Sequence, residues 1–580
     1  MTSSLSHSAP EELSKETSAT LPHYDDDLYQ ESSKKDVSHD TELGIVEEEP
    51  NHKLLRNLKG RHMQMIAIGG SIGAGLFVGS GSALETGGPA SLLIGFIIVG
   101  VMLLCTIFAL GELAVLYPVN GAFFEYSVRF VDPAWGFSMG WLYTFGWLVT
   151  LPYELTAASL TIDFWRSDIN IGVWITVFLV ILSIVQIFGV RGYGEVEFIL
   201  STIKIIACIG FIILGIIINC GGVPTDDRGY IGGRYWRDPG AFRNGFQGFC
   251  SVFVTAAFAF GGTEMVGLAS AEARNPAKAL PKASKQVFWR ITFFYIVNLL
   301  IVGLIVPSDN PELLGASNSN TKASPFVLAI RLAGIKVLPS IFNAIITISV
   351  ISVANSCTYG STRTLQALAE SKMAPKFFAY IDSKGRPIWP VITQLAFGLL
   401  AFINEGTTGT TVLYWLLDVA GLSSFFCWGS ICLAHIRFRQ AWKAQGRSLD
   451  EIPYKAGLGV WGSAFGLFLV IICLISQFYI ALWPVGGTPN ATAFFESYIS
   501  AVISIVGTIV WKLWERDWAA YGISALWTGG WSFGVRVLDM DLDAGRRSVD
   551  GGESEEGEKG GGMGKKGWRG LWKRVGGYVF

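Results

Sequence analysis

The sequence predicts an all-α membrane protein with twelve transmembrane helices, two of them broken in the middle. Hydrophobic residues make up 51% of the 580 residues and charged residues only 16%, a balance typical of polytopic membrane proteins. Apolar windows of about 20 residues, the length of helix that crosses a hydrocarbon core, recur along the chain. The first and the sixth of these windows contain runs of glycine.

The apolar windows define one membrane domain, residues 53–515, between two polar tails. In chain order the windows are 63–83, 91–116, 135–160, 173–190, 198–220, 246–269, 287–307, 337–359, 390–404, 411–435, 461–483 and 494–514. Residues 1–52 are acidic and rich in serine, a composition that cannot bury enough apolar surface to fold. We expect a disordered tail there and a second tail over 516–580.

Basic residues near the ends of the windows predict the orientation. Lysines and arginines precede the first window and follow the sixth, eighth and tenth, all on one side, and only the loop 221–245 places several arginines on the other. Cytosolic loops carry the excess of Lys and Arg, so both tails are expected in the cytosol. The sequon at Asn490 then falls in an outer loop, where an unused chance match is the favoured interpretation.

The first glycine run, AIGGSIGAGLFVGSGSAL over 67–84, leaves two interpretations open. It lacks the third glycine of a dinucleotide loop and the GK[ST] of a phosphate loop. The pairs Gly69 with Gly73 and Gly75 with Gly79 have the small-xxx-small spacing that lets membrane helices pack closely. Glycines at this density also favour a break in the helix.

The sixth window favours the break, because it contains a second interruption, FAFGGTEMVG over 258–267. Broken helices in corresponding halves of a transporter point to a site at the bilayer midplane. Their spacing of five windows predicts two inverted repeats, about 63–220 and about 246–435, with the last two windows (about 461–514) as additions. Free N–H groups at a break bind a carboxylate and free carbonyls bind an ammonium, and an α-amino acid carries both.

Ionisable residues inside the windows are functional candidates because each is costly in lipid. They are Glu112, Glu154, Lys204, Glu264 and Asp418. Glu112 is expected to reach the membrane interface. For Glu154, a role in the site and partial solvation at the helix end stay equally open. Lys204 either extends to the interface or lies in a polar pocket, where desolvation suits proton uptake and release.

The sequence offers no chemistry for an enzyme. The eight cysteines lack CxxC spacing, and the six histidines fall in tails, loops or window ends. A metal site, a disulfide framework and a nucleophile paired with a base are therefore not expected.

Ordered motifs along the chain resemble those of fungal amino-acid permeases of the amino acid-polyamine-organocation superfamily, and most closely the general amino-acid permeases. They include LKGRHMQMIAIGGSIGAGLFVGSG, LPYELTAAS, FCSVFVTAAFAFGGTEMVGLASAE and DLDAGRR, and they run from Leu58 to Arg547. The resemblance implies a LeuT-like fold with discontinuous helices 1 and 6. It also implies import of L-amino acids across the plasma membrane, driven by protons and without another cofactor, with no nucleic-acid partner.

The same resemblance implies which residues hold the substrate. The substrate carboxylate falls on the backbone of helix 1 and the ammonium on carbonyls of both broken helices; these positions are Gly73, Ala74 and Gly75, then Ser71, Phe258 and Gly261. Phe258 is also the expected aromatic lid. Ala74 has no hydroxyl, so its contact must be made by its N–H. Side chains left to set selectivity are Glu154, Thr263 and Asn355.

The resemblance assigns proton coupling to Lys204 and Glu264, and ubiquitin-driven endocytosis to Lys15, Lys34 and Lys35 in the N-terminal tail, where plain solvated lysines are the alternative. Broad specificity is expected. A permease of narrower specificity and a nutrient receptor that signals through its tails are the alternatives. A channel is disfavoured, because the sequence has no filter motif and no ring of pore charges.

Overall fold

The structure, a computed structural model, describes residues 58–165, 168–313, 324–405, 409–514 and 534–546. Almost all of both predicted tails lies outside these residues, including Lys15, Lys34 and Lys35. Apart from turns and loops, the described part consists of helices and one parallel β-bridge between Leu58 and Ala273. The all-helical prediction is thus confirmed for the described residues.

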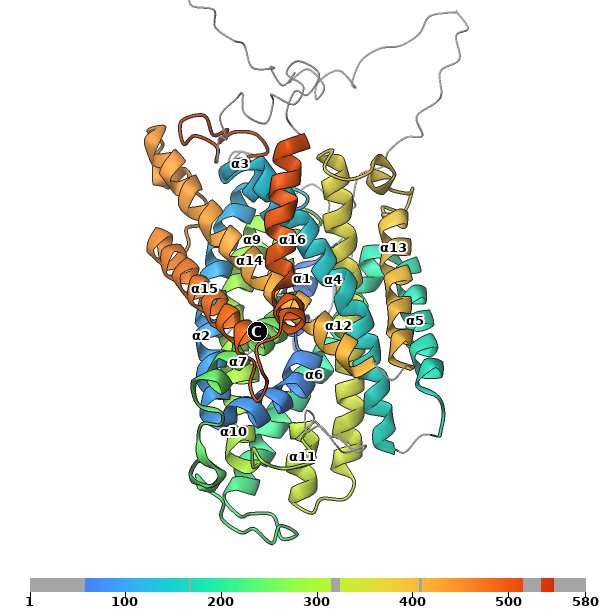
Figure 1. Ribbon diagram of the computed structural model, residues 1–580. Helices are drawn as coiled ribbons and strands as arrows, with labels where there is room; N and C mark the ends of the chain where they lie inside the picture. Colours follow the sequence, from blue (N-terminus) through green and yellow to red (C-terminus); the bar gives the residue numbers. More distant parts are fainter. Residues whose placement is uncertain (1–57, 166–167, 314–323, 406–408, 515–533, 547–580) are drawn as a thin grey trace, which may run out of the picture. The chain divides into compact units, whose positions relative to one another are not determined.

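Each of the twelve predicted windows coincides with a helical stretch of the described residues (Figure 1). The first half of the chain contains α1 (Gly60–Gly69), η3 (Gly75–Gly79), α2 (Ser80–Leu116), α3 (Phe123–Phe130), α4 (Pro133–Ile162), η4 (Asp163–Trp165), α5 (Ile171–Ile187), α6 (Gly189–Asn219), η5 (Trp236–Gly240), α7 (Gly245–Phe260) and α8 (Met265–Leu268). The second half contains α9 (Pro276–Trp289), η6 (Arg290–Val297), α10 (Asn298–Ile305), α11 (Pro325–Leu332), α12 (Leu338–Glu370), η7 (Lys376–Ala379), α13 (Ile388–Gly398), η8 (Leu399–Glu405), α14 (Gly409–Ala444), η9 (Leu449–Glu451), α15 (Gly459–Leu482) and α16 (Ala491–Trp514).

The boundary between the first two windows is a kink rather than a loop. Helical residues continue from η3 into α2, and only Gly88, with φ of 82° and ψ of 169°, leaves the helical conformation. Glycine permits this positive φ, and Pro89, which follows it, has no N–H to continue the helical ladder. The GGP sequence at 87–89 therefore separates the two predicted spans.

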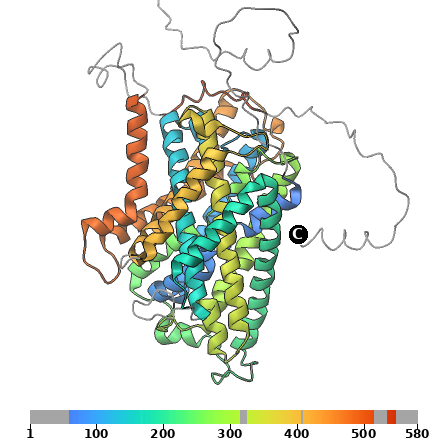
Figure 2. The ribbon, with the colours of Figure 1, turned by 90° about the vertical axis from the view of Figure 1, so that its right-hand side faces the viewer.

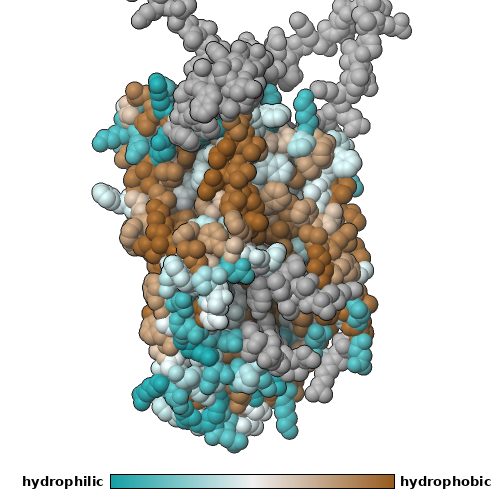
Figure 3. Space-filling model, in the orientation of Figure 1, coloured by the Kyte–Doolittle hydropathy of each residue, from teal (hydrophilic) through white to brown (hydrophobic). Residues whose placement is uncertain are grey.

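Apolar side chains cover the faces of the outer helices, as expected for a chain in lipid. Among the described residues, eight helical stretches are long and apolar enough to cross a membrane, and α5 and the stretch 388–403 are shorter apolar helices. Isoleucines, leucines, valines and phenylalanines lie exposed along α5, α6, α15 and α16. Figure 3 shows this hydrophobic surface in brown above a hydrophilic, teal region. The chain is a multi-pass membrane protein.

Two ends of the helix bundle are named here by the helices that lie there, the α3 end and the α11 end (Figure 1). Between them, the long helices α6 and α12 lie side by side, as Figure 2 shows in teal-green and yellow. Helix α4 packs along α12 and α14, and η3 packs against α7. The two broken helices therefore meet inside the bundle, and α4, α6, α12 and α14 surround them.

A buried cluster of charges lies where α2 and α14 approach the α3 end. Glu112 Oε1 lies 2.6 Å from Arg439 Nε and 3.2 Å from His435 Nε2, and the Ala456 N–H donates to Oε2 at 2.6 Å. Glu112 and His435 are fully buried, so the Glu112 carboxylate does not extend to an exposed interface as the sequence suggested. Four residues beyond His435 on α14, Arg439 lies on the same helix face and supplies the cation that makes this burial tolerable.

Residues 534–546 of the C-terminal region, here called the C-terminal strap, bind back onto the α3 end. The Tyr117 hydroxyl donates to the Leu542 carbonyl at 2.8 Å, and Arg129 donates to the Ala544 carbonyl at 2.5 Å. A hydrogen bond from Arg447 holds the pKa of Asp543 below its usual range. The DLDAGRR motif is thus a structural contact with the membrane domain.

Candidate functional site

The break in the first predicted span separates α1 from η3. Residues 70–73 are non-helical, so the break begins three residues before the predicted Gly73–Gly75, and Ala74 and Gly75 already start the next helical segment. Close packing explains this register. A Cβ on Gly75 would lie 2.4 Å from the Ala259 Cα, and one on Gly73 would lie 2.3 Å from Val353 Cγ2. Both features that the sequence left open as alternatives are therefore present: the helix is broken, and the glycines let neighbouring helices approach closely.

The second break separates α7 from α8 at residues 261–264. Gly262 has φ of +91°, a conformation that glycine adopts at little cost. The Thr263 hydroxyl donates to the Phe260 carbonyl at 2.7 Å and so satisfies an acceptor that the break leaves open. Thr263 does not line the pocket described below; its hydroxyl also accepts a hydrogen bond from the fully buried Arg290.

Tyr295 joins the two breaks. Its hydroxyl oxygen lies 3.0 Å from the carbonyl oxygen of Ser71 and 2.8 Å from that of Ala259. One hydroxyl thus contacts a carbonyl of each broken helix, inside a fully buried part of the bundle. Nothing in the sequence marks this residue, because a tyrosine in an apolar window carries no special pattern.

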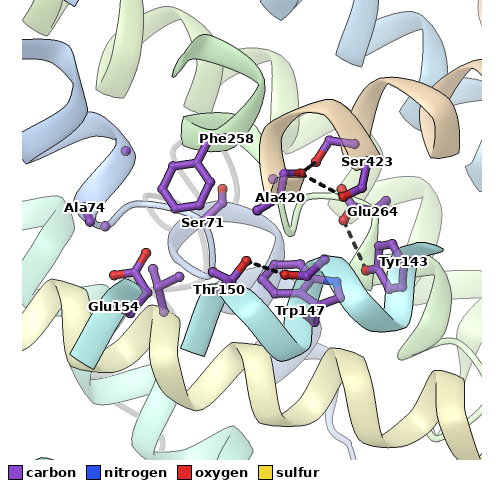
Figure 4. Close-up of a pocket in the computed structure, with 16 residues that line it drawn as sticks. Ser71, Ala74, Tyr143, Trp147, Thr150, Glu154, Phe258, Glu264, Ala420 and Ser423 are labelled. Carbon is purple, nitrogen blue, oxygen red and sulfur yellow. Dashed lines mark hydrogen bonds between the residues drawn. The ribbon is translucent and has the colours of Figure 1, made fainter. Parts of the chain in front are cut away.

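A pocket lies between the breaks, and Figure 4 shows its labelled side chains converging from α4, α7, α14 and the first break. Eight of the residues predicted for the site line it: Ser71, Gly73, Ala74, Gly75, Glu154, Phe258, Gly261 and Glu264. The others that line it are Tyr143, Gly146, Trp147, Thr150, Val353, Ala420, Ser423 and Ser424. The α4 residues recur at helical spacing, which is the signal in the sequence that could have identified them.

Glu264 is held at one side of the pocket by three donors. The Tyr143 hydroxyl and the Gly262 N–H lie 3.1 Å from Oε1, and Trp428 Nε1 lies 3.1 Å from Oε2. Donors from α4, from the second break and from α14 thus meet on one carboxylate. Figure 4 shows the Glu264 and Tyr143 side chains pointing toward each other.

Glu154 lies at the other side, next to Ala74 (Figure 4). Both the Ala74 N–H and the Lys204 ammonium interact electrostatically with its carboxylate, whose Oε2 has no hydrogen-bond partner among the described residues. Lys204 is fully buried on α6 and does not line the pocket; its Nζ lies 3.7 Å from Oε1 of the equally buried Glu197. The structure therefore places Lys204 in a polar pocket and not at the interface.

Asn355 lies outside the pocket. It is buried on α12, and its Oδ1 accepts a hydrogen bond from Gln186 Nε2 at 3.1 Å. Asp418 is also separate from the pocket and accepts a hydrogen bond from Ser497 at 3.3 Å. In the described part of the chain, no group of three or more His, Cys, Asp or Glu side chains could hold a metal ion.

Two aromatic rings separate the pocket from a larger cavity toward the α11 end. Tyr153 and Phe258 pack edge to face with ring centroids 4.8 Å apart. The pocket has a free volume of about 30 Å³, and the cavity, which Tyr153, Thr161 and Asn343 help to line, about 210 Å³. The pocket has room for about two water molecules, so an amino acid can enter only after its walls move apart.

The sequence matches the family described as Amino acid permease over residues 62–521. General amino-acid permease GAP1 of Saccharomyces cerevisiae is 51% identical over 503 residues, which cover 86% of this chain and 81% of that protein. Cationic amino acid transporter 1 of Schizosaccharomyces pombe is 55% identical over 469 residues, covering 80% and 79% of the two chains.

Among solved structures, a manganese transporter of Eremococcus coleocola superimposes with a TM-score of 0.52 at 14% sequence identity, covering 78% of this chain and 93% of that one. This similarity supports a LeuT-like transporter fold. Together with the family match, it identifies the chain as a transporter and not an enzyme. The chain belongs to the amino acid permease family, and its substrates are amino acids.

Proposed function

We propose that the protein imports L-amino acids of several side-chain classes across the plasma membrane together with protons. The transport is by alternating access around the two broken helices, in a bundle of twelve spans built from two inverted five-span repeats with two additional helices. Both tails are cytosolic in this proposal, so the α3 end faces the cytosol and the α11 end faces the outside.

The observation that carries the proposal is the meeting of both breaks in one pocket. Backbone of the first break and of the second lines the same small space, with the carboxylates of Glu154 and Glu264 at its two sides. N–H groups that begin a helical segment attract a carboxylate. Carbonyls and carboxylates attract an ammonium group. An α-amino acid brings these two charges on one carbon.

In this proposal the substrate carboxylate binds the backbone N–H groups at Gly73, Ala74 and Gly75. The ammonium binds near Ser71, Phe258 and Gly261, and the Phe258 ring covers it. Selectivity for the substrate side chain is proposed to come from the pocket walls formed by α4 and α14 and from Glu154, Thr263 and Asn355. Thr263 and Asn355 do not line the pocket, so they would act through the residues that do.

Broad specificity rests on the relatives. One similar protein is called a general permease and another a cationic amino acid transporter, and each is more than half identical to this chain. The pocket contributes two acidic and no basic side chains. We therefore propose that neutral and cationic amino acids are carried better than acidic ones.

Protons are the proposed coupling ion, with Lys204 and Glu264 as the coupling residues. Both are fully or almost fully buried, and a buried ionisable group inside a transporter marks a proton path. Ubiquitin-ligase machinery acting on the cytosolic tails is a further proposed partner.

The test is uptake in a cell that lacks its own amino-acid permeases. Radiolabelled arginine, leucine, proline and glutamate are supplied separately at an acidic and a neutral external pH, with and without a protonophore. The proposal predicts saturable accumulation above the external concentration that the protonophore abolishes. Uptake that never exceeds equilibrium would contradict proton coupling, and uptake of one amino acid alone would contradict broad specificity.

A further inference from the structure

The larger cavity toward the α11 end continues the pocket along the same helices. On α7 the pocket is lined by Phe258 and the cavity by Thr255, about one turn nearer the α11 end. On α14 the pocket-lining residues begin at Ala420, whereas Leu417 and Asp418 line the cavity. Helix α4 and the segment after the first break also line both spaces. A molecule that approaches the pocket from the α11 end therefore passes through the cavity first.

The cavity is large enough to hold an amino acid while the pocket stays closed. Its free volume is about 210 Å³, against about 30 Å³ for the pocket. By the measure that gives the pocket two water molecules, the cavity has room for about 14, which exceeds the number of non-hydrogen atoms in leucine or arginine. The cavity can thus bind a substrate before the walls of the pocket move apart.

Asp418 gives the cavity its charge. Every other residue that lines the cavity, among those the structure describes, is uncharged. Ser497 of α16 donates a hydrogen bond to the Asp418 Oδ2 at 3.3 Å and so orients the carboxylate. An ionisable side chain inside a membrane domain is costly and marks a substrate path more often than a structural contact. A carboxylate on the way to the pocket attracts cations and repels anions.

The rest of the lining suits the remaining parts of an amino acid. Ser82 and Thr255 contribute hydroxyl groups, which can donate hydrogen bonds to a substrate carboxylate. Leu160 and the rings of Tyr153 and Phe164 form apolar walls against which the methylene groups of a long side chain can pack. A concave, mostly apolar space with a few polar groups is the usual composition of a small-molecule site.

The aromatic pair that separates the two spaces has one ring on each side. Tyr153 lines the cavity and Phe258 lines the pocket, and the two rings pack edge to face with centroids 4.8 Å apart. A ligand in the cavity therefore contacts Tyr153 directly. It reaches the pocket only when these two rings move apart.

We propose that the cavity is an outer binding site for cationic amino acids, in which Asp418 binds the ammonium or guanidinium group of the substrate side chain before the substrate enters the pocket. The side-chain cation is the group selected, because the charges of the α-ammonium and α-carboxylate offset each other. Neutral amino acids pass without this interaction, and acidic ones are repelled. This inference rests on the proposed function, which makes the α11 end the outer side, and it names the substrate class favoured on entry.

The first experiment compares initial uptake of radiolabelled arginine and leucine by the full chain in cells that lack their own permeases. Asp418→Asn should raise the KM for arginine about tenfold, because a hydrogen bond between two charged groups is lost. The KM for leucine and the maximal rates for both substrates should stay unchanged. Asp309→Asn is the matched control, since Asp309 is exposed between α10 and α11 and does not line the cavity. It should match the wild type.

The second experiment uses decarboxylated arginine, which carries both cationic groups and no carboxylate. It can occupy the cavity, but it lacks the group that the N–H donors of the first break are proposed to bind. It should slow leucine uptake by the wild type without being accumulated itself. Half-maximal inhibition of Asp418→Asn should need about ten times more of it, whereas Asp418→Glu keeps the charge and should stay close to the wild type.

The outcomes separate this inference from the proposed function. A wild type that accumulates no amino acid would refute the proposed function. If the wild type accumulates amino acids, equal KM values for arginine in Asp418→Asn and Asp309→Asn would refute the outer site alone. Equal inhibition of the wild type and Asp418→Asn by decarboxylated arginine would do the same. Equal losses of arginine and leucine uptake in Asp418→Asn would show that Asp418 supports the fold and does not select substrates.

Discussion

The two glutamates of the pocket differ in how the chain holds them. Glu264 accepts hydrogen bonds from three donors on three segments, each at 3.1 Å. Glu154 has one buried oxygen without a partner among the described residues, and its counter-charge Lys204 also lies 3.7 Å from Glu197. One carboxylate thus connects three segments through hydrogen bonds, and the other keeps an unsatisfied oxygen inside the bundle.

This difference shows that burial alone does not describe the surroundings of a carboxylate. Both glutamates are at most 1% exposed. What separates them is the number of hydrogen-bond donors that each one accepts from. Removing a carboxylate oxygen of Glu264 should therefore cost more, because each unsatisfied donor left behind costs free energy.

The largest effect is expected for Glu264→Gln. Its amide has one acceptor oxygen for three donors, and its NH2 group must face either the Tyr143 hydroxyl or the indole N–H of Trp428. We expect transport to be lost at every pH and the free energy of unfolding to fall by about 1–3 kcal/mol. Uptake assays together with thermal unfolding of the detergent-solubilised protein measure both. Normal transport and unchanged stability would contradict a structural role for these three hydrogen bonds.

A pair of glycine substitutions tests the close helix packing at the first break, beside Glu154. Gly75→Ala places a Cβ against the backbone of Ala259, whereas Gly73→Ala places one against the side chain of Val353. Both should impair transport, by a cost of roughly 1–3 kcal/mol. Only the second should recover in a double variant with Val353→Ala, because only a side chain can be shortened.

Uptake rates corrected for the amount of protein at the cell surface measure this difference. Gly60→Ala is the matched control, since a Cβ on Gly60 meets nothing within 4 Å. Normal uptake by Gly73→Ala alone, without Val353→Ala, would show that the contact with Val353 does not limit transport.

The smallest effect is expected for Tyr143→Phe, which removes one of the three donors to Glu264 and keeps the ring. A hydrogen bond from a neutral hydroxyl to a carboxylate contributes about 1–3 kcal/mol. We expect a modest fall in thermal stability and a few-fold weaker affinity, because the Gly262 N–H and Trp428 still donate to the carboxylate. Unchanged stability and affinity would show that the Tyr143 hydroxyl contributes nothing to holding Glu264.

The sequence predicted the features that depend on composition and local pattern. Apolar windows found helices because a span must satisfy its backbone internally. The glycine runs located both breaks to within a few residues. Phe258, Gly261 and the residues of the first break line one pocket in the structure, and their roles stay predictions.

The features it missed depend on contacts between distant helices. Glu197 fell one residue before the predicted fifth window, although its spacing of two turns from Lys204 put both on one helix face. Arg290, at the start of the predicted window 287–307, was among the basic residues after the sixth window that predict the orientation, yet it is fully buried beside Thr263. Only the folded chain shows which helix supplies a partner, as Ser352 of α12 does for Glu197.

The C-terminal strap has a practical consequence for experiments on this protein. The strap packs against the ends of α2 and α14, α3 and the segment around η9. It accepts hydrogen bonds there from four side chains: Tyr117, Arg129, Gln445 and Arg447. A purification tag or fluorescent protein joined before residue 534 would delete these bonds and expose the polar groups beneath them. Fusions should therefore begin after Arg546, and a shortened chain should be compared with the full one before any loss of transport is assigned to a tail signal.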